Sequence, residues 1–299
     1  MEVQKKVLNR FKYLIDTRDV DEVMKNLYQK LDLLVYLHEV LVQEKVQLRN
    51  NEVFLESLVM KFYLHGLTLR DIGRGFKIKS DYLDNAVLVN KEMIDISSLF
   101  TVGRAQLETF LMYHHIYVND NDENVQNLRY YAWLHSALLQ RFQYQDGNIP
   151  DHIVENTRNE IEQLKEKIVN CPAYSQLTDK QQDALITKGD GKTFKKWHHI
   201  FEECNFSRRG FVEKFYYLLS VYAHSEGLSG IQLKQMGYEK SGETNQTYLW
   251  LQIATSWILT GKMISNLVAR FPTVKKVYDK LDENIKLEIE VLVKILHEN

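Results

Sequence analysis

Helix-breaking residues are scarce in this sequence. Its 299 residues include only 3 prolines and 13 glycines, well below the average usage of about 5% and 7%. Both residues interrupt helices and mark turns, so their scarcity favours long helices. We therefore predict an all-α protein, a multi-helix bundle with long antiparallel helices.

Cysteine is scarcer still. The two cysteines, Cys171 and Cys204, belong neither to a Cys-x-x-Cys pair nor to a Cys/His cluster with the spacing of zinc ligands. The sequence therefore indicates neither a disulfide framework nor a zinc centre. We predict a reduced, cytoplasmic protein without a metal site or a cofactor.

Long apolar runs are also missing. The most apolar segment, residues 248–260, contains Gln252 and ends shortly before Lys262. It is shorter than the roughly 20 residues that a bilayer-spanning helix needs. The first residues form an amphipathic pattern without the apolar stretch and cleavage site of a secretory signal. We expect a buried core helix at 248–260, no export and no membrane partner.

Neither sign of charge is in excess. The 38 basic and 40 acidic residues give a net charge of −2, so no global field attracts nucleic acid or an anionic membrane. The string Gly191-Lys192-Thr193 is not a Walker phosphate loop, because Ile186 occupies the position of the required first glycine. A solvated surface explains this region, and the alternative is a local basic patch beside Trp197, made of Lys192, Lys195, Lys196, His198 and His199.

The spacing of apolar residues divides the chain into helical segments. We predict an N-terminal helical region at 1–79, a central helical bundle domain at 80–271 and a C-terminal capping helix at 272–299. Within the central domain, residues 173–193 combine a short helix with loop and are the best candidate for a mobile insert. Thr178 is expected to cap the short helix.

The segment from Asp81 to Asn119 is the candidate central helix, with Ser80 and Asp81 as its cap. Arg104 lies on its apolar line, and Glu108, four residues later, is placed to pair with Arg104. Two interpretations are open: a structural ion pair that ties this helix to its neighbours, or part of a polar site. The apolar line consists of Leu83, Val87, Met93, Phe100, Leu107 and Leu111.

A second polar stretch lies within residues 211–230. His224 stands near the carboxyl end of a predicted helix, where the helix dipole favours a protonated imidazole. Hydroxyl and imidazole groups within one turn could bind a phosphate or a carboxylate, and they belong to Ser220, Tyr222, His224 and Ser225. The alternative is a helix cap in which His224 bonds the last carbonyl groups.

A third candidate pair consists of Arg129 and His135, six positions apart in the string RYYAWLH. This spacing resembles the Arg/His motif of the HEPN superfamily, whose helical domains bind nucleotides or cleave RNA. Six positions rotate by about 600° on a regular helix, which places the two side chains on different faces.

Two longer motifs carry a further resemblance. The strings GRAQLETFLMYHHIY, with Arg104 and Glu108, and FYYLLSVYAHSEG, with Ser220 and His224, resemble an uncharacterised group of bacterial helical proteins known as a domain of unknown function. Its members share an Arg-x-x-Leu-Glu helix and a later Leu-Ser-x-Tyr-x-His ending. The resemblance implies a bundle in which Arg104, Glu108 and His224 meet in one pocket, and a distant likeness to HEPN-type bundles.

Two functions are compatible with these patterns. The first is a helical binding or scaffold module of the bacterial cytosol, for instance in a toxin or phage-defence system, that binds a protein partner or a second copy of itself. Its polar centre then fixes the register of the helices. The alternative is a HEPN-like RNase or nucleotide-binding effector with Arg104, Glu108 and His224 as catalytic residues. In that case Arg104 clamps a phosphate of RNA or a nucleotide, and His224 exchanges a proton.

Overall fold

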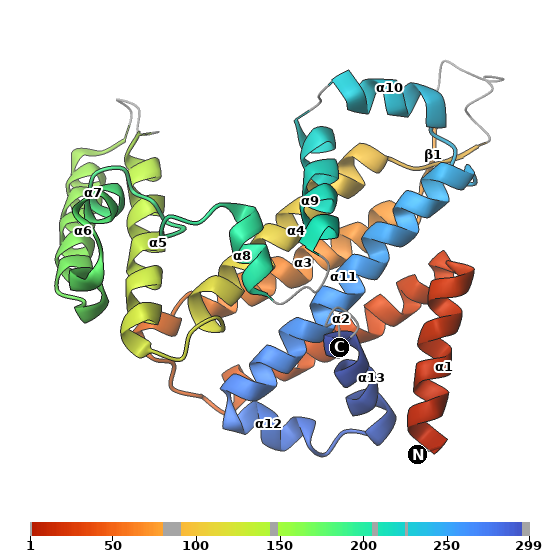
Figure 1. Cartoon of the computed structure of the whole chain (residues 1–299), viewed down its shortest axis with the longest axis horizontal. Coiled ribbons are helices and arrows are strands. Elements are labelled where there is room, and N and C mark those ends of the chain that lie inside the picture. Colours follow the sequence, from red (N-terminus) through yellow and green to blue (C-terminus); the bar gives the residue numbers. More distant parts are fainter. Residues whose placement is uncertain (1, 80–90, 144–148, 205–208, 225–226, 295–299) are drawn as a thin grey trace. The chain divides into compact units, whose positions relative to one another are not determined.

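A computed structural model describes residues 2–79, 91–143, 149–204, 209–224 and 227–294 (Figure 1). These residues form 13 α-helices, two short 3-10 helices and one pair of two-residue strands. The all-α helical bundle predicted from the sequence is confirmed. Among the described helices, none is long and apolar enough to cross a membrane.

The chain folds into two compact units. Unit 1 comprises residues 1–47, 55–110 and 205–299, and unit 2 comprises residues 48–54 and 111–204. These bounds differ from the predicted division at 79/80 and 271/272. The reason is that packing partners are distant in the sequence: the C-terminal α11 and α13 pack on the N-terminal α2 and α1.

Unit 1 is built around the long helix α11, which packs against α2, α3, α12 and α13. Residues 248–260 lie within α11 and include the buried Leu249, Ile253 and Trp257, so the predicted core helix is confirmed. The elements of unit 1 are α1 (Glu2–Thr17), α2 (Val20–Gln43), α3 (Leu55–Gly73), β1 (Phe76–Lys77), β2 (Glu92–Met93), most of α4 (Ile96–Tyr117), α9 (Arg209–Ala223), α10 (Gly227–Met236), α11 (Glu243–Arg270), α12 (Pro272–Tyr278) and α13 (Glu283–Lys294).

Unit 2 is a smaller helical unit in which α5 packs against α6. Its apolar core includes Leu128, Ile168, Ala173 and Leu185. The segment predicted as a mobile insert, 173–193, therefore contributes to this core. The elements of unit 2 are the end of α4, η1 (Asn50–Glu52), α5 (Glu123–Gln143), α6 (Asp151–Val169), η2 (Pro172–Gln176), α7 (Asp179–Ile186) and α8 (Trp197–Glu203).

Side-chain caps mark the starts of α7 and α4. Thr178 caps α7 through a capping box with Gln181, as the sequence predicts. The central helix starts later than predicted, at Ile96, because Met93 pairs with Phe76 in the small sheet and Asp95 accepts a hydrogen bond from the Ser98 amide at 2.9 Å. The predicted cap at Ser80 and Asp81 lies outside the described residues.

The C-terminal segment forms two helices where the sequence predicts one. After α12, residues 279–282 form a turn, and the Asp282 carboxylate accepts a hydrogen bond from the Asn284 amide at 2.8 Å. An aspartate in this position satisfies a free amide at the start of α13. The single capping helix predicted at 272–299 is therefore divided.

Candidate functional site

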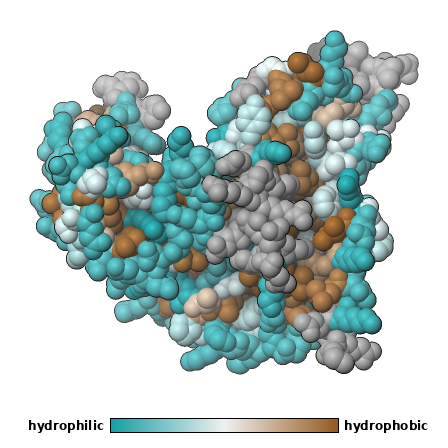
Figure 2. Space-filling model, viewed as in Figure 1, coloured by the Kyte–Doolittle hydropathy of each residue, from teal (hydrophilic) through white to brown (hydrophobic). Residues whose placement is uncertain are grey.

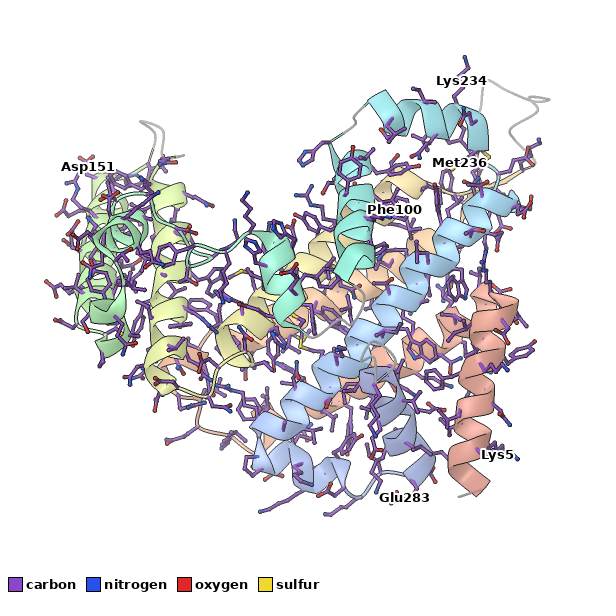
Figure 3. All side chains as sticks on the ribbon, in the orientation of Figure 1. Lys5, Phe100, Asp151, Lys234, Met236 and Glu283 are labelled. Atoms are coloured by element: carbon purple, nitrogen blue, oxygen red, sulfur yellow. The ribbon has the colours of Figure 1, made fainter. Side chains whose placement is uncertain are left out.

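Aromatic packing sets the orientation of α9 in unit 1. Phe100 of α4, labelled in Figure 3, lies with its ring centroid 4.8 Å from that of Tyr222 on α9 and 5.3 Å from that of Tyr248 on α11. Phe215, Leu219 and Tyr222 are buried, so one face of α9 belongs to the core. The neighbouring face, with Tyr216 and His224 at four-residue steps, is thereby presented to Arg104 on α4.

Four side chains from α4 and from α9 and its end form what we call the polar centre: Arg104, Glu108, Tyr216 and His224. The Arg104 guanidinium donates from Nε to Glu108 Oε1 at 2.9 Å and from Nη2 to the Tyr216 hydroxyl at 3.2 Å. Its Nη1 lies 2.8 Å from His224 Nε2. The Tyr216 hydroxyl donates to Glu108 Oε1 at 2.7 Å. Each guanidinium nitrogen is thus bonded to a different side chain.

The Glu108 carboxylate raises the pKa of both Arg104 and Tyr216. Burial alone would lower the pKa of Arg104, but the hydrogen bond and the charge of Glu108 outweigh it and raise that pKa. Burial, followed by the Glu108 carboxylate, raises the pKa of Tyr216. The side chains of Arg104 and Glu108 are 19% and 26% exposed. A cationic Arg104 and a neutral Tyr216 are the forms that can donate to Glu108.

His224 lies at the exposed end of the polar centre. A guanidinium has no acceptor, so Nε2 of His224 must accept the hydrogen bond and carry no proton. The bond therefore requires a neutral imidazole, whereas the helix dipole alone predicts a protonated one. The backbone amide of His224 donates to the Ser220 carbonyl at 3.0 Å and closes the last turn.

The structure brings Arg104, Glu108 and His224 together, and their catalytic role stays a prediction. The other predicted binding residues of this stretch do not join them. Ser220 Oγ donates to the Tyr216 carbonyl at 2.8 Å within α9. Tyr222 is 3% exposed and faces the core, where burial raises the pKa of its hydroxyl to about 12. Ser225 lies outside the described residues.

Tyr216 is the member of the polar centre that sequence reasoning missed. Its only signal is position, because Tyr216, Ser220 and His224 follow one another at four-residue steps and so share a helix face. Helical spacing predicts instead that Phe211, Phe215, Leu218 and Tyr222 face the core. Leu218 is half-buried, and the fully buried position is Leu219.

The pair Arg129 and His135 lies on α5 in unit 2. Arg129 donates from Nη1 to the His115 carbonyl at 2.9 Å. His135 is fully buried, and burial lowers the pKa of its ring. No hydrogen bond joins the two side chains within the described part of the chain, in agreement with their placement on different helix faces.

Unit 2 contains a polar cluster that the sequence did not reveal, made of His115, Asn119, Thr193, Lys195 and Glu203. His115 Nε2 lies 2.8 Å from Thr193 Oγ1, and Asn119 donates to Glu203 Oε2 at 2.7 Å. Glu203 also bonds to Lys195. The partners are separated by up to 88 sequence positions (115 to 203), so no local pattern could identify them.

Electrostatics hold Glu203 ionised. Burial would raise the pKa of Glu203, but the nearby His115, whose Nδ1 lies 3.8 Å from Glu203 Oε2, and the hydrogen bond and charge of Lys195 outweigh it and lower that pKa to about 2. Burial lowers the pKa of His115. Because Lys195 is paired in this way, the predicted basic patch is reduced in charge.

Metal ligation finds no support among the residues that the structure describes, since these contain no group of three or more His, Cys, Asp or Glu side chains placed to hold an ion. A comparison with known protein families, curated proteins and solved structures finds no match to the chain. The resemblances to a domain of unknown function and to HEPN bundles therefore stay predictions.

Proposed function

We propose that the chain is a helical binding module, in which the polar centre fixes α9 against α4 and so holds a protein-binding surface in one arrangement. The observation that carries this proposal is the hydrogen bonding of the Arg104 guanidinium. All three nitrogens of Arg104 are bonded to side chains of the chain itself. A ligand of Arg104 would have to replace these hydrogen bonds. A polar centre that fixes the position of α9 against α4 needs them unchanged.

The surface next to the polar centre supports this proposal. Four large apolar side chains on α9, on α10 and just after α10 are exposed, with Tyr217 at 59% and Ile231 at 57%. Figure 2 shows apolar side chains gathered over α10. The sequence of α10 has a single charged residue, Lys234. Contiguous exposed apolar patches mark interaction sites, and we define the α9–α10 surface as Tyr217, Leu228, Ile231 and Tyr238.

A second copy of the chain is the simplest partner, because a two-fold interface needs only one self-complementary patch. We expect sedimentation velocity to show a concentration-dependent dimer for the wild type. Ile231→Asp places a charge in the α9–α10 surface and should give a monomer, because a buried unpaired charge is costly.

The matched control is Leu64→Asp, which changes a similarly exposed apolar residue (54%) on α3. It should leave the dimer intact. A wild type that stays monomeric at high concentration, or equal dissociation by both variants, would overturn the dimer proposal.

A nucleotide- or RNA-cleaving centre is the second candidate function. The observation that favours it is the exposed His224 ring, whose unprotonated Nε2 lies beside a cationic guanidinium. In this candidate Arg104 clamps a phosphate, Glu108 orients Arg104 and His224 exchanges a proton. Loss of Arg104 would then abolish RNA cleavage and leave the mobility of α9 unchanged, whereas the binding module predicts a looser α9.

A further inference from the structure

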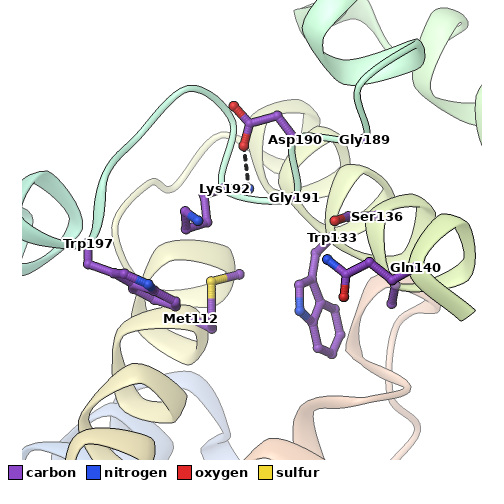
Figure 4. Close-up of a pocket in the computed structure, with 10 residues that line it drawn as sticks. Met112, Trp133, Ser136, Gln140, Gly189, Asp190, Gly191, Lys192 and Trp197 are labelled. Atoms are coloured by element: carbon purple, nitrogen blue, oxygen red, sulfur yellow. Dashed lines mark hydrogen bonds between the residues drawn. The ribbon is translucent and has the colours of Figure 1, made fainter. Parts of the chain in front are cut away.

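Unit 2 contains a pocket of about 290 Å³ between α5, the loop that follows α7 and the start of α8 (Figure 4). Trp133 and Trp197 enter it from different elements, and Met112 lies between the two indoles in this view. Lys192 supplies a cation, and Ser136 and Gln140 supply polar groups on the α5 side. Polar groups make up more of the exposed lining than apolar groups, so the pocket suits a ligand that combines a ring with a polar or charged group.

Two aromatic side chains, Phe54 and Tyr130, pack near the Trp133 ring. Its centroid lies 6.1 Å from the ring of Phe54, at an interplanar angle of 79°, and 6.4 Å from the ring of Tyr130. The indole is half-buried, so the part that lines the pocket forms a fixed aromatic surface. A planar ligand can pack against such a surface at little entropic cost to the protein.

Lys192 is also held in place. Its ammonium lies 5.2 Å from the centroid of the Trp197 ring, within cation–π range. The neighbouring Asp190 carboxylate accepts hydrogen bonds from the backbone amides of Lys192, at 3.1 Å, and Phe194, at 2.9 Å. Asp190 also lines the pocket, but its two carboxylate oxygens accept these two backbone amides, so Asp190 shapes the loop and Lys192 provides the positive charge of the pocket.

The loop that carries Lys192 is firmly anchored. Thr193 and Phe194 have φ angles of 48° and 72°, which are costly for side chains with a Cβ and most of all for a β-branched threonine. The hydrogen bond between Thr193 and His115, at 2.8 Å, holds this conformation. A Cβ on Gly191 would lie 2.8 Å from the Ser136 Cβ, so only glycine lets the loop approach α5 so closely.

From this geometry we infer that the pocket binds a small planar aromatic anion, such as an aromatic carboxylate, with its ring on Trp133 and its anionic group on Lys192. The volume of about 290 Å³ lies just below the range of about 300–1,000 Å³ for small-molecule pockets, which favours a ligand of one or two fused rings. This site belongs to unit 2 and is independent of the α9–α10 surface.

Indole-3-acetate and indole-3-acetamide are suitable probes, because they share ring and shape and differ in charge. The chain contains 4 tryptophans, so a ¹H–¹⁵N spectrum resolves four indole N–H signals. We expect indole-3-acetate to shift the Trp133 and Trp197 signals of the full chain saturably, and to leave those of Trp250 and Trp257, which lie in unit 1, in place. The amide should bind about tenfold more weakly, since hydrogen bonds to charged groups contribute most.

Variants separate the two parts of the pocket. Lys192→Met should weaken indole-3-acetate about tenfold and leave the acetamide unchanged. Trp133→Leu should weaken both probes by about threefold to tenfold, the range expected for loss of an aromatic contact. Lys196→Met is the control, because Lys196 is exposed and does not line the pocket. Absence of saturable shifts, equal affinity for both probes, or binding that both pocket variants leave unchanged would overturn the proposal.

Discussion

Glu203 is a partly buried carboxylate that three side chains of unit 2 surround. It accepts hydrogen bonds from Asn119 and Lys195 and lies 3.8 Å from His115 Nδ1. Its pKa of about 2 in the folded chain is below the unperturbed value of 4.5. The pKa of His115 is also lowered, from 6.5, chiefly by burial. In both cases the unfolded chain binds a proton more readily than the folded chain.

Both pKa shifts make unit 2 less stable at lower pH. A depressed folded-state pKa contributes stability above the unfolded pKa and loses it as the pH falls. We therefore expect the free energy of unfolding of unit 2 to fall below about pH 6.5 through His115, and further between about pH 4.5 and 2 through Glu203. Urea titrations at a series of pH values, followed by the indole ¹H–¹⁵N signals of Trp133 and Trp197, measure the free energy of unfolding of unit 2.

Glu203→Gln is the comparison for the acidic window. Below about pH 4.5, the free energy of unfolding of the variant should no longer show the decrease that Glu203 causes. The decrease that begins near pH 6.5, which belongs to His115, should remain. Identical pH profiles for wild type and variant below 4.5 would contradict the assignment to Glu203.

Single residues differ in how far the sequence could reveal them. Arg104 and Glu108 were predictable as a pair, because four-residue spacing brings side chains together on any helix. The meeting of His224 with Arg104, across 120 positions, was expected only from a resemblance to other proteins. No sequence pattern indicates the cluster around Glu203, since its members come together only in the tertiary fold.

At the level of elements, the start of α4 decides where Arg104 lies along its helix. Asp95 accepts hydrogen bonds from the Ser98 amide at 2.9 Å and from the Ser98 hydroxyl at 2.5 Å. An aspartate in this position satisfies an amide that has no partner within the helix and interacts favourably with the helix dipole.

Asp95→Ala should lower the free energy of unfolding by about 1 kcal/mol, the usual effect of losing such a cap. Chemical denaturation of wild type and variant measures the difference. Asp95→Asn keeps the accepting oxygen and should retain most of the stability. If the alanine and asparagine variants are equally destabilised, Asp95 does not act as a cap.

Elements with a continuous apolar stripe are the easiest to predict from periodicity: apolar spacing predicts helices at 20–48 and 150–171, and the structure has α2 and α6 there. The early part of the predicted central helix was misassigned because Met93 suits an apolar helix position and a buried strand position equally well. Its pairing with Phe76 depends on contacts outside the local window. The break between α12 and α13 was missed because Asp282 can stand on an exposed helix face or at a cap.

At the level of the whole molecule, the two units each carry one proposed interaction site. Unit 1 has the α9–α10 surface beside the polar centre, and unit 2 has the pocket between Trp133 and Lys192. The division into units could not be predicted, because unit 1 joins three separate parts of the chain. Composition and apolar spacing indicate local structure, and they do not show which distant segments of the chain pack together.

Amide hydrogen exchange of Arg104→Ala tests the central proposal, that the polar centre holds α9 in place. We expect amides of α9 to exchange about tenfold faster or more, because the variant loses charged hydrogen bonds between α4 and α9. Amides of α2 and α11 in the same unit should keep their protection. Arg74→Ala, which changes an arginine whose side chain is 63% exposed, should leave α9 as in the wild type. Unchanged exchange of α9 in Arg104→Ala would contradict the account and favour a ligand-clamping role for Arg104.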